Sequence, residues 1–221
     1  MTHERIEAGQ SDETPHDQDK EEVSRGHKRL IYELFVLGEL MDGPYHGYKL
    51  REILSSLLGP FRQISWGILY PLIRQLEREG SIASEREIMT EAREQASSST
   101  RQRRRYTITT TGRALFYTLM LEQSDYNADY RELFIIKLNN FDHLSPEQQL
   151  VVLSHYRGYL QIEALYLKGG KQLASTDAGV PDDQRAHIHR NIRFKESGLA
   201  GEVQWIEQHI KLLEDQQEEH A

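Results

Sequence analysis

Residues 64–80, with the sequence ISWGILYPLIRQLEREG, decide the fold of this chain. Large aliphatic side chains recur along them at helical spacing, which predicts a helix that buries one side. These aliphatic residues are Ile64, Leu69, Leu72, Ile73 and Leu76. The opposite side carries polar, aromatic and basic residues, namely Ser65, Trp66, Tyr70, Arg74 and Gln75. Because Gly80 is a suitable helix stop, the stretch predicts one amphipathic helix whose outer face is free to contact a partner.

A basic hairpin is predicted directly after this helix. Residues 82–89 form an alternating polar segment, and RQRRRYTIT, residues 101–109, alternates again and is strongly basic. The outbound strand is expected to end between residues 92 and 95, and a serine-rich tip covers residues 96–100. A helix followed by a two-stranded basic hairpin is typical of a winged helix, so residues 64–80 are predicted to be its DNA recognition helix.

Two shorter helices are predicted before the recognition helix. Residues 28–41 and 46–58 both show helical apolar periodicity. Gly43 and Pro44 separate the two segments, because glycine and proline interrupt helices. With residues 64–80 they supply the three-helix core that a helix-turn-helix module requires.

The charge of the chain is unevenly distributed. The 221 residues contain no cysteine and carry a formal net charge of −8. Residues 1–22 contribute −6 and residues 114–221 contribute −7, whereas residues 23–113 hold fifteen Lys and Arg against ten Asp and Glu. The predicted DNA-binding segment is therefore the only positive one, and the local field governs attraction to phosphate. We find neither a signal peptide nor a membrane-spanning stretch, so we expect a cytoplasmic protein with no membrane contact.

The rest of the chain is predicted to be helical. Residues 109–144 have the signature of one long helix, Ser145–Pro146–Glu147 begins a second that extends to about residue 173, and residues 182–217 form a third. The expected fold class is mostly α, with a winged helix-turn-helix of three helices and a two-stranded β wing before an all-helical region. We expect residues 1–22 to be a disordered acidic tail, 23–112 the DNA-binding domain and 113–221 a helical dimerisation domain that can also hold an effector.

Candidate DNA contacts lie at two places in the winged segment. The start of a recognition helix reaches base edges in the major groove, and the arginines of a wing contact phosphate. The recognition helix and the residue just before it supply Gln63, Ser65, Trp66, Tyr70 and Arg74. Trp66 is equally well interpreted as a core residue. The wing supplies Arg93, Arg101, Arg103, Arg104 and Arg105.

Three blocks of this chain resemble the signature of the PadR family of bacterial transcriptional regulators. They are HGYKLREIL at residues 46–54, GILYPLIRQLEREGSI at 67–82 and RRYTITTTGRALF at 104–116. Tyr70 matches the family's LYP tyrosine next to the DNA backbone, and Tyr48 matches a chiefly structural tyrosine whose hydroxyl also reaches phosphate. Tyr106 and Gly112 match the block that closes the wing. The resemblance implies a homodimer that binds double-stranded DNA at a palindromic operator, usually as a repressor released by a small molecule.

The resemblance also suggests roles for the C-terminal helices, which in one branch of the family mediate dimerisation. The predicted dimerisation residues are Leu119, Val203, Trp205, Ile206, Ile210 and Leu213. Aromatic side chains there either line an effector pocket or belong to the core, and the core is the more frequent outcome for such a stripe. The pocket candidates are Tyr126, Tyr130, Phe134 and Tyr156. A small aromatic effector is expected, and a phenolic acid, as in some family members, is one alternative.

Two other functions compete with a DNA-binding repressor. A winged-helix adaptor that binds a protein partner without recognising DNA would suit the acidic C-terminal half. An enzyme would need converging polar residues, and the sequence displays no phosphate-binding glycine loop. His187 and His189 are spaced i, i+2, which places them on different helix faces rather than on one metal. We therefore expect no catalytic residues, no cofactor and no metal site.

Overall fold

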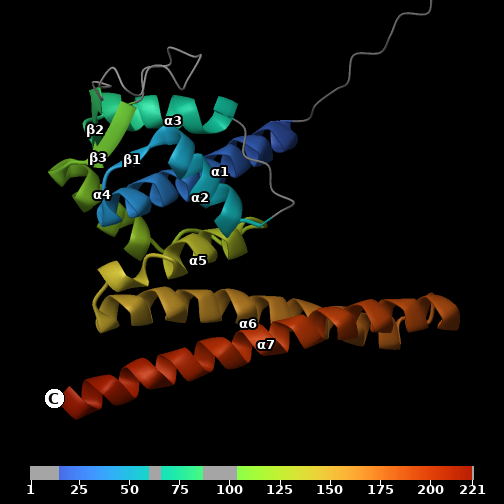
Figure 1. The fold of residues 1–221 in the computed structure, drawn as a ribbon. Coiled ribbons are helices and arrows are strands. Elements are labelled where there is room, and N and C mark those ends of the chain that lie inside the picture. The colour runs from blue at the N-terminus through green and yellow to red at the C-terminus, as the bar shows by residue number, and fades with distance from the viewer. Residues whose placement is uncertain (1–14, 60–65, 87–103, 221) are drawn as a thin grey trace, which may run out of the picture.

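The computed structural model describes residues 15–59, 66–86 and 104–220, and Figure 1 shows two stacked parts. The upper part contains a small sheet and the helices α1 (Pro15–Asp42), α2 (Gly47–Leu57), α3 (Trp66–Arg78) and α4 (Thr110–Leu121). The lower part contains α5 (Tyr130–Leu138), the short 3-10 helix η2 (Phe141–His143), α6 (Pro146–Thr176) and α7 (Asp182–His220). The mostly helical winged fold predicted from the sequence is confirmed.

Helix α1 is the centre of the molecule. It lies between α3 above and α5 below (Figure 1), and it packs against both. Every residue from 31 to 40 is buried, including Leu34, Phe35 and Leu37, which are fully enclosed. The helix starts at Pro15, well before residue 28. Residues 15–22 of the predicted tail are therefore helical, because proline suits a first helical turn and the following Gln, Lys and Glu residues are good helix formers. The rest of that tail lies outside the described residues.

The sheet has three antiparallel strands in the order β1-β3-β2. Strand β2 (Ile82–Arg86) pairs with β3 (Arg104–Ile108) from Ile82 opposite Ile108 to Arg86 opposite Arg104. The predicted hairpin is present as far as it is described. The prediction missed strand β1 (Tyr45–His46), which pairs with β3 at Tyr106 and Arg105. Two residues are too few to leave a period-2 pattern in the sequence.

Residues 109–144 do not form the single helix that their composition predicted. Helix α4 ends at Leu121 and α5 begins at Tyr130. Between them the side-chain amide of Asn127 donates to the Asp125 carbonyl oxygen at 3.0 Å, and its oxygen accepts from the Asp129 backbone N–H at 2.8 Å. Such local bonds of Asn and Asp compete with helical ones, which accounts for the break.

Helices α6 and α7 form a long antiparallel pair across the bottom of the molecule (Figure 1). The predicted start of α6 is confirmed by a capping box, in which the Ser145 hydroxyl accepts from the Gln148 backbone N–H at 3.4 Å and the Gln148 side-chain oxygen accepts from the Ser145 N–H at 3.0 Å. This pair lies on the opposite side of the molecule from α3.

Candidate nucleic-acid interface

Helix α3 lies at the top of the molecule (Figure 1) and exposes side chains on its outer side. Its apolar residues Leu69, Ile73 and Leu76 are fully buried, as the periodicity predicted. Ile68 is 47% exposed and Tyr70 36% exposed, and the Arg74 side chain is also exposed. The helix ends with a glycine motif: Gly80 has φ +75°, and the Ser81 N–H donates to the Leu76 carbonyl oxygen at 2.9 Å. The exposed side of α3 therefore has the shape and composition expected of a groove-binding helix.

Strands β2 and β3 bring arginine side chains beside the end of α3. Arg104 and Arg105 of β3 are exposed. Arg104 lies directly opposite Arg86 of β2, and its guanidinium Nη1 is 3.4 Å from the Glu77 carboxylate on α3. Two like charges directly opposite each other on a sheet are unfavourable. Glu77 offsets part of that repulsion, and a bound anion would offset more. Arg86 was not among the residues predicted to contact DNA, because it lies before the basic run at residues 101–105.

Tyr48 is the exposed residue at the start of α2, with 51% of its surface accessible. Its ring stacks on that of His46, with 5.5 Å between the centroids. The His46 Nδ1 is 3.1 Å from the carbonyl oxygen of Arg104. Tyr48 therefore lies next to the strand that carries the wing arginines, although it is far from them in sequence.

Thr109 and Gly112 hold the segment that closes the wing against the end of α3. The Thr109 hydroxyl accepts from the Gly112 backbone N–H at 3.1 Å and donates to the Gly80 carbonyl oxygen at 2.6 Å. A Cβ atom on Gly112 would lie 2.0 Å from the Ser81 carbonyl oxygen, so only glycine fits there. Tyr106 is buried in the same layer, and burial raises the pKa of its phenol. Tyr106 and Gly112 are thus structural residues of the wing.

Several candidates lie outside the described residues: Gln63, Ser65, Arg93, Arg101 and Arg103. Trp66 is the first residue of α3, but its side chain is not among those described. The structure therefore brings together Tyr48, Tyr70, Arg74, Arg104 and Arg105 on the winged part.

The four aromatic pocket candidates form a stacked cluster between α5 and α6. Phe134 and Tyr156 stack in parallel with 3.7 Å between centroids, and Tyr126 and Tyr130 meet edge to face at 5.0 Å. Burial raises the pKa of Tyr130, whose hydroxyl contacts His155 Nδ1. Tyr130, Phe134 and Tyr156 are all buried. The cluster is chiefly core, and Phe134 and Tyr156 also border a cavity.

Two neighbouring hollows open on the helical region. One, of about 390 Å³, lies between α5 and α7 and is bordered by Phe134, Tyr156 and Trp205; we call it the α5–α7 pocket. The other, of about 460 Å³, lies between α6 and α7. Both are bordered by Arg131 and Glu202, which no sequence signal had singled out. Charged residues on amphipathic helices are usually solvated, so only their positions in the fold reveal such a pairing.

The six predicted dimerisation residues are divided equally between buried and partly buried positions. Leu119, Ile206 and Ile210 are buried in the chain's own core. Val203, Trp205 and Leu213 are partly buried and pack against that core. Within the described ranges no helix is long and apolar enough to cross a membrane. In the same part of the chain no three His, Asp or Glu residues gather as a metal site.

A helix-turn-helix core with a β-hairpin wing defines the winged-helix class. Residues 36–117 match the model of the transcriptional regulator PadR-like family. The winged part of this chain therefore matches that family of transcriptional regulators, which confirms the resemblance found in the sequence.

Solved structures of PadR-type regulators align with most of the chain at low sequence identity and low TM-score. Bacillus subtilis PadR in complex with operator DNA is 18% identical, with a TM-score of 0.37 over 82% of this chain and 98% of that one. The same protein in complex with p-coumaric acid is 18% identical, with a TM-score of 0.35 over 83% of this chain and 99% of that one. The PadR-like regulator BC1756 from Bacillus cereus is 20% identical, with a TM-score of 0.31 over 84% of this chain and 99% of that one. A comparison with curated proteins finds no match.

Proposed function

We propose that this transcriptional regulator is a repressor that binds a palindromic DNA operator as a homodimer and is released by a small aromatic effector. The observation that carries the proposal is the exposed face of α3, with Tyr70 and Arg74, beside the arginines of β2 and β3. The helix inserts into the major groove, and Arg104 and Arg105 contact the flanking phosphates. Tyr48 reaches the same backbone from the start of α2. Such a regulator works in the cytoplasm, where bacterial DNA lies.

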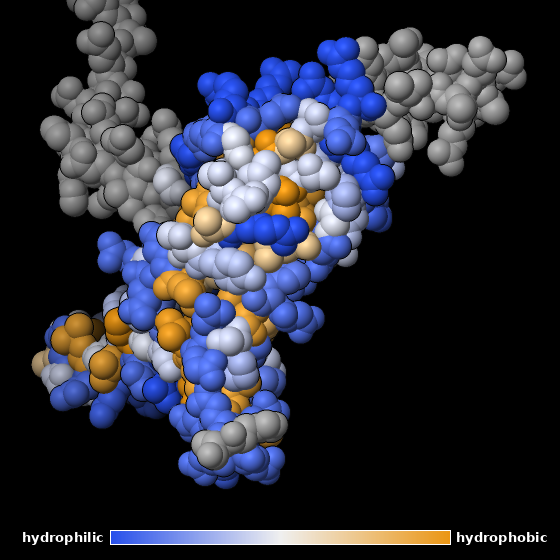
Figure 2. Space-filling view, turned by 90° about the vertical axis from the view of Figure 1, so that its left-hand side faces the viewer, coloured by the Kyte–Doolittle hydropathy of each residue, from blue (hydrophilic) through white to orange (hydrophobic). Residues whose placement is uncertain are grey.

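Exposed apolar side chains on α6 and α7 support the dimer. Figure 2 shows hydrophobic side chains that reach the surface over the lower, helical part of the molecule. On α6 they recur at helical spacing on the side away from the core, and α7 adds one aromatic ring. These residues are Ile162, Leu165, Tyr166, Leu173 and Phe194. Tyr166 and Phe194 are each 79% exposed, which is unfavourable unless another apolar surface covers them. A second copy joined here would fix the separation of two α3 helices.

DNA binding should be measured by fluorescence anisotropy with the DNA upstream of the gene for this protein, at several salt concentrations. We expect Arg74→Glu and Arg105→Glu each to weaken binding at least tenfold and to reduce the salt dependence, because each loses a phosphate contact. Arg193→Glu is the matched control: Arg193 is exposed on α7, outside the winged part, and the same charge reversal there should change little. Light scattering on the complex should give two chains per operator.

If both variants bind this DNA as tightly as the wild type, the proposed DNA-binding face is refuted, and if the wild type does not bind this DNA, the DNA-binding proposal itself is refuted. That outcome would favour the competing hypothesis of a winged-helix adaptor that docks a protein. Equal affinity for DNA molecules of unrelated sequence would refute recognition of a specific operator.

A further inference from the structure

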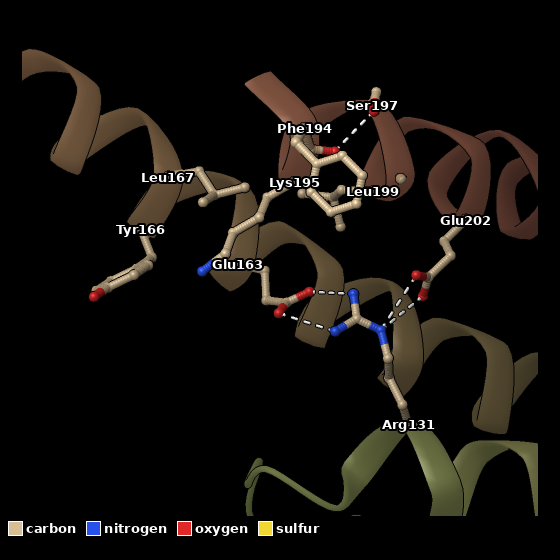
Figure 3. Close-up of a pocket in the computed structure, with 10 residues that line it drawn as sticks. Arg131, Glu163, Tyr166, Leu167, Phe194, Lys195, Ser197, Leu199 and Glu202 are labelled. Atoms are coloured by element: carbon tan, nitrogen blue, oxygen red, sulfur yellow. Dashed lines mark hydrogen bonds and ion pairs between the residues drawn. The ribbon is translucent and has the colours of Figure 1, made fainter. Parts of the chain in front are cut away.

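The two hollows of the helical region meet at one ion cluster. Figure 3 shows Arg131 reaching from α5 to a position between Glu163 of α6 and Glu202 of α7. Its Nη2 is 2.5 Å from a Glu163 carboxylate oxygen, and its Nε is 3.2 Å from both oxygens of Glu202. The Tyr156 hydroxyl also donates to Glu202. Three helices are therefore joined at this single guanidinium.

The guanidinium of Arg131 has little capacity left for an anionic ligand. Its Nη1 donates to the Tyr159 hydroxyl at 3.2 Å and to Glu163 at 3.1 Å, in addition to the bonds above. Four of the five N–H groups of an arginine are thus engaged. One positive and two negative charges leave the cluster with a net negative charge. A ligand carboxylate in the α5–α7 pocket would meet the engaged donors of Arg131 and the repelling carboxylate of Glu202, whereas Glu163 borders only the other hollow.

The α5–α7 pocket instead offers what an organic cation needs. Its walls include the aromatic rings of Phe134, Tyr156 and Trp205 and the aliphatic side chains of Leu138 and Ile206. Aromatic rings attract cations as well as apolar groups. The Glu202 carboxylate is contacted by Arg131 and Tyr156 on one side, and its side chain is still 36% exposed, so part of the carboxylate remains accessible from the pocket. Lys195 borders the other hollow rather than this one. The volume of about 390 Å³ suits a molecule with one aromatic ring.

We propose that the α5–α7 pocket binds a small lipophilic cation, such as a quaternary or protonated aromatic amine, with its positive head beside Glu202 and its apolar body against Phe134, Tyr156 and Trp205. Its role as effector rests on the proposed function, whereas the binding itself does not. The ligand would lie between α7 and α5, and α5 packs directly on α1, the central helix of the winged part.

The test is calorimetry on the full chain with three probes of similar size and different charge. These are benzyltrimethylammonium, its neutral carbon isostere neopentylbenzene, and the anion 3-phenylpropionate. We expect the cation to bind at least tenfold more tightly than the other two, because only the cation gains from Glu202 and the ring faces. This comparison needs no variant, so a folding defect cannot obscure it. Equal or tighter binding of the carboxylate, or no binding of the cation because a second chain covers the pocket, would overturn the proposal.

A variant identifies the carboxylate responsible. Glu202→Gln keeps the shape and should lower the affinity for the cation at least tenfold while leaving the neutral probe unchanged. Glu207→Gln is the matched control, because Glu207 is exposed on α7 and does not border the pocket. An unchanged cation affinity in Glu202→Gln contradicts the proposal. Operator binding is measured separately, so its failure would count against the proposed repressor and not against the pocket.

Discussion

The replacement Gly112→Ala tests whether the closure of the wing depends on a close backbone approach. The added Cβ would lie 2.0 Å from the Ser81 carbonyl oxygen and 2.8 Å from Ile108 Cγ1. The first of these atoms is backbone, so the strand or α4 must move. That movement also strains the bond from the Thr109 N–H to the Ser81 carbonyl oxygen, now 3.1 Å long.

We expect this variant to lose about 2–4 kcal/mol of unfolding free energy, of which roughly 1–3 kcal/mol is overpacking and about 1 kcal/mol the weakened hydrogen bond. Urea unfolding followed by circular dichroism measures the loss. Gly169→Ala is the matched control, because nothing lies within 4 Å of its Cβ position inside α6. That change should stabilise the protein by about 0.5–1 kcal/mol. An unfolding free energy of Gly112→Ala within about 0.5 kcal/mol of the wild-type value would show that wing closure does not depend on this close approach.

The remaining predictions concern two buried charged groups. Lys137 is 4% exposed and donates to the Glu122 carbonyl oxygen at 2.7 Å, and burial lowers its pKa from 10.5 to about 8. The unfolded chain therefore holds more protons between these values, and the wild type should gain about 3 kcal/mol relative to Lys137→Met as the pH rises from 8 to 10.5. Urea unfolding of both proteins across that range checks this, and parallel curves would contradict it. Burial, followed by the nearby charge of Asp42, raises the pKa of Glu39 from 4.5 to about 6. Here the folded chain holds more protons, so the wild type should lose about 2 kcal/mol relative to Glu39→Gln as the pH rises from 4.5 to 6. The same titration at low pH measures it, and a constant difference would show that Glu39 ionises equally in both states.

The winged part was largely predictable because its signals are local. The spacing of Leu69, Ile73 and Leu76 determines which side of α3 is buried, whatever the rest of the chain does. Gly80 ends the helix through its own backbone conformation. Ser145 and Gln148 cap α6 using only their own turn. The boundaries predicted from these residues accordingly agree with the structure within a few positions.

The errors arose where distant segments decide the outcome. Residues 109–144 contain enough helix formers for one helix, and side-chain bonds around Asn127 interrupt it. Strand β1 exists only because β3 passes beside it.

The sequence by itself determined most of the helices and the exposed face of α3, because periodicity and caps act within a few residues of one another. Only the tertiary structure decided what the helical region can bind. Arg131 is separated from Glu163 and Glu202 by many residues, and the three meet because α5 packs against the α6–α7 pair. Whether an arginine is available to a ligand depends on which carboxylates fold against it, and that is a property of packing rather than of local sequence.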